Sequence, residues 1–389
     1  MTPPPAPHAV ATAGAGRLAS RRVDSAYALD QAAATATKSG PAPAPIELLP
    51  LELLDAILAR AAVHDRVQCS AVSRALHSAA ARALFANVHL TSLRQLDRFL
   101  NGLRASATNA SASVAAQCTT HLHVHLRALA TSVAAALRAI VAACPHLEVV
   151  TIEGLGNAPM ADAALIELVN PQLRSITVRG ATYASDAWLT KLAFHGADKL
   201  ESLTLDRVAA ITATGALAHL HRMLHLRSLT ISDCARLPLR DIAMYLAHPT
   251  LVVLRLPGLR GYSWAVPPDP QTAPTLIPSP RPGVRCKWPD PRTFTSSAAA
   301  TPIAAFETML RDQLPSLRVL DLAESDLNPA VLAAIERAWC VQDPNRARVL
   351  KLRQCFGVAP TDLDLIHMAR PHWTVQWPPG WTRTSGTVH

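Results

Sequence analysis

The chain has 389 residues, half of them hydrophobic, and is longer than a typical domain of roughly 100–200 residues. Its formal charge is +9, but the basic residues are dispersed without a long run of like charges, which argues against a nucleic-acid-binding surface. No segment reaches the ~20 apolar residues of a membrane span, and seven scattered cysteines without a C-x-x-C pair argue against a disulfide framework. We therefore expect a cytoplasmic or nuclear protein that binds neither nucleic acid nor membrane.

The chain begins with a segment that we expect to be a disordered tail. Residues 1–44 are rich in Ala, Pro, Thr and Ser and show no apolar periodicity. They lack the apolar centre of a secretory signal. A transit peptide remains an alternative, because Arg17, Arg21 and Arg22 occur with no acid before Asp24.

Residues 45–84 predict a small helical module. Apolar residues recur there at helical spacing, and a break at residues 63–65 separates the first helix from the next. Three short helices of about 40 residues make a core that is marginal on its own. The surplus apolar surface of such a module must face a partner or the next domain.

The same segment resembles the F-box family. Leu49-Pro50 opens the first helix, Leu53-Leu54-x-x-Ile57-Leu58 continues it, Asp65 precedes the second, and Cys69-x-x-Val72-Ser73-Arg74 opens the third. Leu76 departs from the family pattern, which usually has Trp there. The resemblance implies docking to a Skp-type adaptor, and through it to cullin and RING subunits, by Leu49, Pro50, Leu53, Ile57, Leu58 and Val72. The alternative is a plain helical cap of the following array, which would bury Leu49, Leu53 and Ile57.

From residue 85 to 375 we expect a leucine-rich-repeat array. The unit L-x-x-L-x-L, followed by a helical stretch, recurs about every 25–27 residues, inside the range of such repeats. The clear copies begin at Leu147, Leu173, Leu200, Leu226, Leu251 and Leu317, and weaker copies at Phe85, Thr119 and Ala347. Helices are predicted over residues 162–169, 185–194, 239–247 and 329–340. A Pro-rich insertion at 257–301 interrupts the array, and a tail follows from 376 to 389.

The predicted fold class is α/β: a three-helix F-box-like module, then a solenoid with parallel strands on the concave side and helices on the convex side. If the repeat leucines point inward, the alternate residues face the concave surface. This places small polar residues in columns across neighbouring strands: Thr151, Thr177, Thr204 and Thr230, and beside them Ser175, Ser202 and Ser228. Trp373, Trp377 and Trp381 are expected to cover the C-terminal end of the array.

Histidines and charged residues are the candidates for chemistry on the concave face. His121, His123 and His125 alternate on one strand, with His89 expected beside His123. They would make a metal site or a pH-sensitive patch, but no matching ligand stands nearby. We therefore favour a polar patch that contacts a target, with no metal or other cofactor.

Glu153, Arg179 and Asp206 occupy one column of successive repeats, as an ion-pair ladder, a recognition stripe or both. Farther along, Arg255, Lys351 and Arg353 are expected to make the face basic and suited to an acidic or phosphorylated target. The predicted target-binding set is His89, His123, Thr151, Arg179, Thr204, Asp206, Arg255, Lys351 and Arg353.

The sequence carries none of the catalytic motifs that mark hydrolases, nucleotide-binding enzymes or zinc proteases. It therefore favours a non-enzymatic substrate-recognition subunit of an SCF-type E3 ubiquitin ligase, in which the repeats hold a target protein. One alternative is a repeat scaffold without a ligase role. A second alternative is an enzyme with a metal site at the histidines.

Overall fold

The structure is a computed structural model in which only part of the chain is described. Residues 1–48, 259–301 and 377–389 lie outside it, and with them most of the predicted tails and of the insertion. The described residues are 49–105, 115–125, 132–154, 161–195, 198–234, 237, 239–258, 302–325, 327, 329–343, 346–353, 355 and 372–376. No helix among them is both long and apolar enough to cross a bilayer.

The chain divides into two compact units. The first comprises residues up to Leu122 together with Ala142–His146, and the second comprises His123–Val141 and the chain from Leu147. The first unit contains α2 (Leu51–Arg60), α3 (Val63–Ser70), α4 (Arg74–Phe85), β1 (Asn87–Leu90) and α5 (Leu93–Ala105). Thus β1 and α5, which the sequence predicts to be part of the array, group with the helical module.

The three predicted helices of the module form, and their core is small and aliphatic. Leu54 and Leu58 of α2 pack with Leu76, Ala79 and Ala80 of α4. The second helix begins at Val63, so Asp65 lies in its first turn rather than before it. A carboxylate is favourable there because the helix N-terminus carries partial positive charge.

Side chains also hold the helices together. Arg66 donates to three backbone carbonyls, at 3.0 Å to Ala61, 3.0 Å to Ala83 and 2.8 Å to Ala59. It thereby satisfies acceptors that the ends of α2 and α4 leave open. Because its guanidinium is a planar fork of donors, a lysine at this position would not reach all three carbonyls.

The strands follow sequence order in one ten-stranded sheet. After β1 these are β2 (His121–His125), β3 (Val149–Glu153), β4 (Ser175–Arg179), β5 (Ser202–Asp206), β6 (Ser228–Ser232), β7 (Val253–Arg255), β8 (Val319–Asp321), β9 (Arg348–Lys351) and β10 (Trp373–Gln376). Each pairing from β3 to β10 is parallel. This is the predicted α/β architecture, a leucine-rich-repeat-like solenoid.

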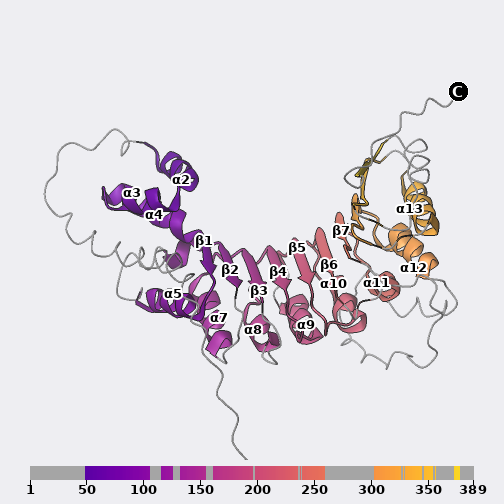
Figure 1. Ribbon diagram of the computed structural model, residues 1–389, viewed down its shortest axis with the longest axis horizontal. Coiled ribbons are helices and arrows are strands. Elements are labelled where there is room, and N and C mark those ends of the chain that lie inside the picture. The colour runs from indigo at the N-terminus through magenta and orange to yellow at the C-terminus, as the bar shows by residue number, and fades with distance from the viewer. Residues whose placement is uncertain are drawn as a thin grey trace, which may run out of the picture. The chain divides into compact units, whose positions relative to one another are not determined.

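Helices connect the strands. They are α7 (Ser132–Ala143), α8 (Ala161–Glu167), α9 (Asp186–His195), the π-helix η2 (Ala213–Leu217) with α10 (Ala218–Leu220), α11 (Leu239–Tyr245), α12 (Pro302–Thr308) with the π-helix η4 (Met309–Gln313), and α13 (Pro329–Gln342). The four predicted helices match α8, α9, α11 and α13 to within three residues at each end. In Figure 1, α8, α9 and α10 lie on the same side of β3 to β6.

The strand register is the predicted one. The repeat leucines are buried, as shown by Leu203 and Leu205 of β5, whose side chains are inaccessible to solvent. Opposite them, the threonines Thr151, Thr177, Thr204 and Thr230 pair in one column, and Ser175, Ser202 and Ser228 pair in the next. Because side chains alternate across a strand, burying the leucines places these hydroxyls on the other face.

Side chains also join successive repeats. Asp186, at the start of α9, accepts from the backbone N–H of Thr212 at 2.8 Å and from its hydroxyl at 2.6 Å. Asp162 accepts from Ser185 in the same way one repeat earlier. The thiols of Cys234 and Cys355 lie against carbonyls of the preceding repeat, as does the hydroxyl of Ser325. Burial raises the pKa of Cys234 to about 11, so its thiol is neutral and structural.

The backbone turns in the same way at the end of successive strands. The residue three positions after the threonine column adopts a positive φ: Gly154, Gly180, Arg207, Asp233, Gly258 and Glu324. In five of the six, its N–H donates to a carbonyl of the next repeat. Glycine accepts this conformation without steric cost, whereas Arg207, at φ 54°, bears strain.

Candidate functional site

An apolar surface lies on the three-helix module. Leu53 is 51% exposed, Ile57 48% and Val72 69%, although all three are aliphatic. Leu51 and Val63 are exposed to a similar degree. We call Leu53 and Ile57, which lie one turn apart on the same face of α2, the apolar patch. Neither Leu53 nor Ile57 is part of the module's own core.

One of the predicted adaptor contacts is wrong. Leu58 is only 3% exposed because it lies one turn from Leu54, on the face of α2 that packs against α4. It therefore stabilises the module and is not available to a partner. Leu49 is partly buried against the same core, whereas Pro50 is exposed and precedes the first turn of α2.

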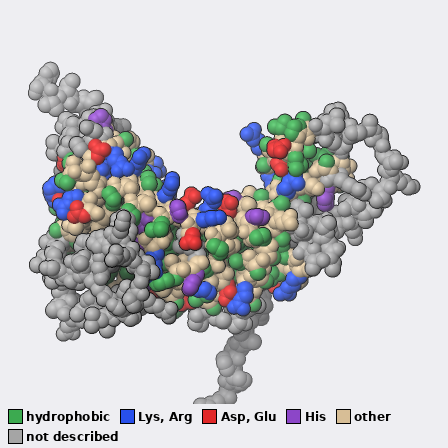
Figure 2. All heavy atoms as spheres, turned by 180° about the vertical axis from the view of Figure 1, so that it is seen from behind, with side chains coloured by type: hydrophobic (Ala, Val, Ile, Leu, Met, Phe, Trp, Pro, Cys, Tyr) green, Lys and Arg blue, Asp and Glu red, His purple; other side chains and the backbone are tan. Residues whose placement is uncertain are grey.

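The second candidate surface is the face of the second unit's sheet that lies opposite the buried leucines. We call it the open face. Figure 2 shows basic, acidic and histidine side chains interspersed over part of the molecule. The predicted residues Thr151, Thr204, Arg179 and Asp206 all lie on the open face in adjacent strands.

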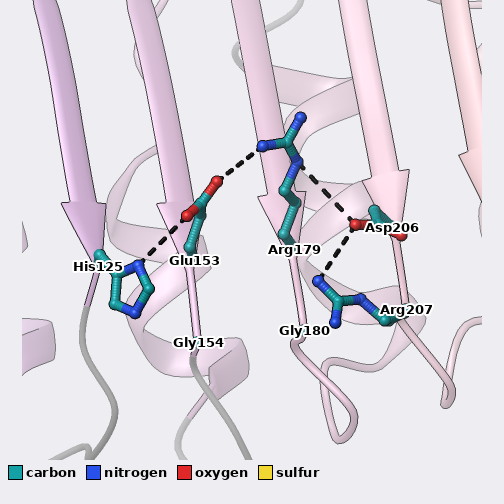
Figure 3. A pocket seen from close by; sticks show the side chains of 7 residues that line it. All are labelled: His125, Glu153, Gly154, Arg179, Gly180, Asp206 and Arg207. Carbon is teal, nitrogen blue, oxygen red and sulfur yellow. Dashed lines mark hydrogen bonds and ion pairs between the residues drawn. The ribbon is translucent and has the colours of Figure 1, made fainter.

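A chain of charges crosses the open face from β3 to β5 (Figure 3). An Arg179 nitrogen donates to Glu153 at 2.8 Å, and its Nε lies 4.0 Å from Asp206. Asp206 also accepts from the Ser232 hydroxyl at 3.0 Å and lies 3.5 Å from Arg207. The ion-pair ladder is therefore formed, and its acids and arginines alternate from strand to strand.

The histidines of β2 lead into this ladder. Nδ1 of His125 lies 3.3 Å from Oε2 of Glu153, and Nε2 of His123 lies 3.5 Å from the same oxygen. The hydrogen bond from Arg179 holds the pKa of Glu153 below its usual value, with smaller contributions from both histidines. Both histidines therefore contact the Glu153 carboxylate. The sequence did not predict this contact.

A shallow pocket of about 470 Å³ opens over the ladder. The residues that line it are His125, Glu153, Gly154, Arg179, Gly180, Asp206 and Arg207. Each charged group faces an opposite charge, so the pocket suits a polar partner rather than a bare ion.

The predicted basic region needs a correction. Arg255 of β7 pairs in register with Asp321 of β8, and Asp321 pairs with Lys351 of β9. An acid therefore stands between two cations, and the column alternates instead of being uniformly basic. Arg353 is exposed and donates to Gln376 at 3.3 Å. Applying the repeat pattern to the copy at Leu317 would have identified Asp321.

The remaining predictions concern histidines and metal ligands. His89 is exposed on β1 in the first unit, and His123 belongs to the second, so their adjacency stays a prediction. Among the described residues, no group of three His, Cys, Asp or Glu is arranged to hold a metal ion. Trp373 is buried and packs edge-on against Trp339, with 4.9 Å between the ring centroids. Trp377 and Trp381 lie outside the described residues.

Comparisons with known proteins identify no family for the chain. No family model matches the chain, and no curated protein matches it. Among solved structures, the chain is similar to one in the crystal structure of the Rad7 and Elc1 complex in yeast. That match has 14% identity and a TM-score of 0.36 over 97% of each chain. At this TM-score the likeness carries no inference about function.

Proposed function

We propose that the protein is a non-catalytic substrate-recognition subunit of an SCF-type ubiquitin ligase. The observation that carries the proposal is the apolar patch on a module whose own core is already filled by Leu54, Leu58 and Leu76. Solvent-exposed Leu53 and Ile57 lie one turn apart on α2, and Val72 lies in the turn before α4. Exposed aliphatic side chains that lie side by side on one helix face, as Leu53 and Ile57 do, mark interaction sites.

The resemblance to the F-box family indicates which protein would bind the apolar patch. The resemblance includes Leu53, Ile57 and Val72, which the structure leaves exposed, and Leu54, which it buries. A Skp-type adaptor would cover the apolar patch, and cullin and RING subunits would join through it. The chain would supply no chemistry of its own. It would hold the target so that its lysines react with ubiquitin at high effective concentration.

The open face is the proposed target-holding surface. It presents hydroxyls and charges on a rigid parallel sheet rather than on loops, which limits the entropy lost on binding. The proposed ligase would act in the cytoplasm or the nucleus.

The test is co-purification of the full chain with a Skp-type adaptor. We expect the Leu53→Ser/Ile57→Ser variant to bind at least about tenfold more weakly, since each buried aliphatic side chain contributes roughly 1.5–3 kcal/mol. Its circular dichroism and melting should stay near those of the wild type, because both side chains are exposed.

Two control variants separate binding from folding. Leu224→Ser/Val341→Ser changes two exposed aliphatic residues of the second unit and should keep the adaptor. Leu54→Ser/Leu58→Ser should unfold the module. If the wild type captures no adaptor, or the Leu53/Ile57 variant keeps it, the proposal fails and a repeat scaffold remains.

A further inference from the structure

The open face changes character between β6 and β7. The position occupied by Ser175, Ser202 and Ser228 in β4 to β6 is occupied by valine in the next three strands. Val253, Val319 and Val349 pair in register and are partly exposed. Three valines on adjacent strands make a continuous apolar strip, which the fold does not require because serine occupies the same position elsewhere.

Cations line this strip on one side. Arg255 follows Val253 by two residues, and Lys351 follows Val349 by two, so both project from the same face. Arg353 lies at the end of the same region. The acid between them, Asp321, accepts from the backbone N–H of Ala323 at 3.1 Å. Within the described part of the chain, neither Arg255 nor Lys351 makes an ion pair.

This region differs from the ladder on β3 to β5. There, each arginine faces an acid on its own or a neighbouring strand. On β7 to β9 the cations outnumber the acid, and an apolar strip runs beside them. The combination offers apolar contact area and unmatched positive charge to one partner.

We infer that Val253, Val319 and Val349, with Arg255 and Lys351, bind a protein segment that carries an apolar side chain flanked by carboxylates. We call these five residues the valine site. Neighbouring strands are about 4.8 Å apart, so Arg255 and Lys351 are separated by about 10 Å. The two carboxylates should match that distance.

The position of Asp321 favours Asp or Glu over a phosphorylated residue. A phosphate bound at Arg255 or Lys351 would lie about one strand spacing, ~5 Å, from the Asp321 carboxylate. Its charge of nearly −2 would be repelled more strongly than that of a carboxylate. The inference rests on the proposed function, because it specifies the target that the open face would hold.

The test uses the purified full chain without any adaptor, so its outcome is independent of the co-purification above. The probes are fluorescent peptides of about 12 residues, long enough to cross three strands. Each has one Leu between two Glu residues at varied separation. Matched series carry Gln, Lys or phosphoserine in place of Glu, and binding is followed by fluorescence anisotropy.

We expect one Glu separation to bind at least about tenfold more tightly than its Gln counterpart, with affinity falling as salt rises. Val319→Ser should weaken binding several-fold without unfolding, because serine occupies the equivalent position in β6. Lys351→Glu should abolish the preference for Glu and favour the Lys series. Lys191→Glu, an equal charge change at an exposed position of α9, should alter nothing.

Three kinds of result would overturn the inference. Equal binding of the Glu, Gln and Lys series, or no binding of any, would show that the site does not select acidic segments. Tighter binding of the phosphoserine series would assign the site to phosphorylated targets instead. An unchanged Val319→Ser affinity would remove the valine strip from the site.

Discussion

At the scale of single residues, several polar groups are buried for structural reasons and respond to solution conditions. His248 is buried in the second unit, where Nε2 lies 3.0 Å from the Met223 carbonyl and Nδ1 3.3 Å from the Thr250 hydroxyl. Burial lowers the pKa of His248 to about 4. The imidazole is therefore neutral at physiological pH and links neighbouring repeats.

Stability should therefore fall on acidification. The folded pKa of His248 is about 4, and the unfolded value is about 6.5. Below pH ~6.5 the unfolded chain takes up a proton that the folded chain excludes, so stability present above that pH is lost as pH falls towards 4. The loss is on the order of 3 kcal/mol. Urea unfolding at several pH values measures how the free energy of unfolding depends on pH. This dependence should be weaker in His248→Gln than in the wild type.

The pH dependence of stability should be weaker in His248→Gln but should not disappear. The pKa values of His219 and His221 are also lowered, mainly by burial, and both groups titrate in the same direction. An identical pH profile for His248→Gln and the wild type would contradict the assignment.

The turn after each strand provides a second residue-scale prediction. Arg207→Gly should stabilise the fold by up to about 1 kcal/mol, because it removes a side chain from a left-handed conformation. Gly180→Ala should destabilise it by roughly the same amount. The new Cβ would have room, with its nearest contact at 3.7 Å, so the cost is that of the backbone alone. Thermal melting of the two variants checks both signs.

At the scale of elements, helices are aligned with one another by carboxylates. Asp186 of α9 accepts two hydrogen bonds from Thr212, and that residue caps the following helix through Gly215. Gly215 is required because an added Cβ would lie 2.0 Å from the Asp186 carboxylate. Sequence periodicity predicts the helices but not this contact between them.

Changing the carboxylate should therefore loosen the junction of two repeats. Asp186→Asn keeps the shape and one acceptor but presents an amide to the Thr212 hydroxyl. We expect a loss of about 1 kcal/mol, measured by urea unfolding. Asp198→Asn, at an exposed position, is the matched control and should be neutral. Equal effects of the two changes would show that the Thr212 contact contributes nothing.

At the scale of the whole molecule, the two units have different modes of stabilisation. The three-helix module of the first unit has a small core that depends on few residues. The second buries leucines in every repeat, and each repeat contacts its neighbours in sequence. Stability in such an array is a sum over units and their interfaces, so end repeats are less stable than central ones.

Hydrogen exchange should show this gradient. Amides of β4 to β6 have paired strands on both sides and should be the most protected, whereas amides of β10, paired with β9 alone among the described strands, should exchange fastest. Uniform protection from β4 to β10 would mean that the array unfolds as a single cooperative unit.

The sequence alone determined the repeat architecture and the columns of the open face. Leucines at a fixed period must all be buried, and alternation along a strand then places Thr151, Thr177 and Thr204 side by side. The same rule could have identified Asp321 and the valine strip. Only the tertiary structure decided that Leu58 is buried while Ile57 is exposed. Helical spacing predicts an apolar face but not which of its side chains will pack against a neighbouring helix. The tertiary structure also decided that His123 and His125 meet Glu153, because side-chain conformation and the packing of adjacent strands set that contact.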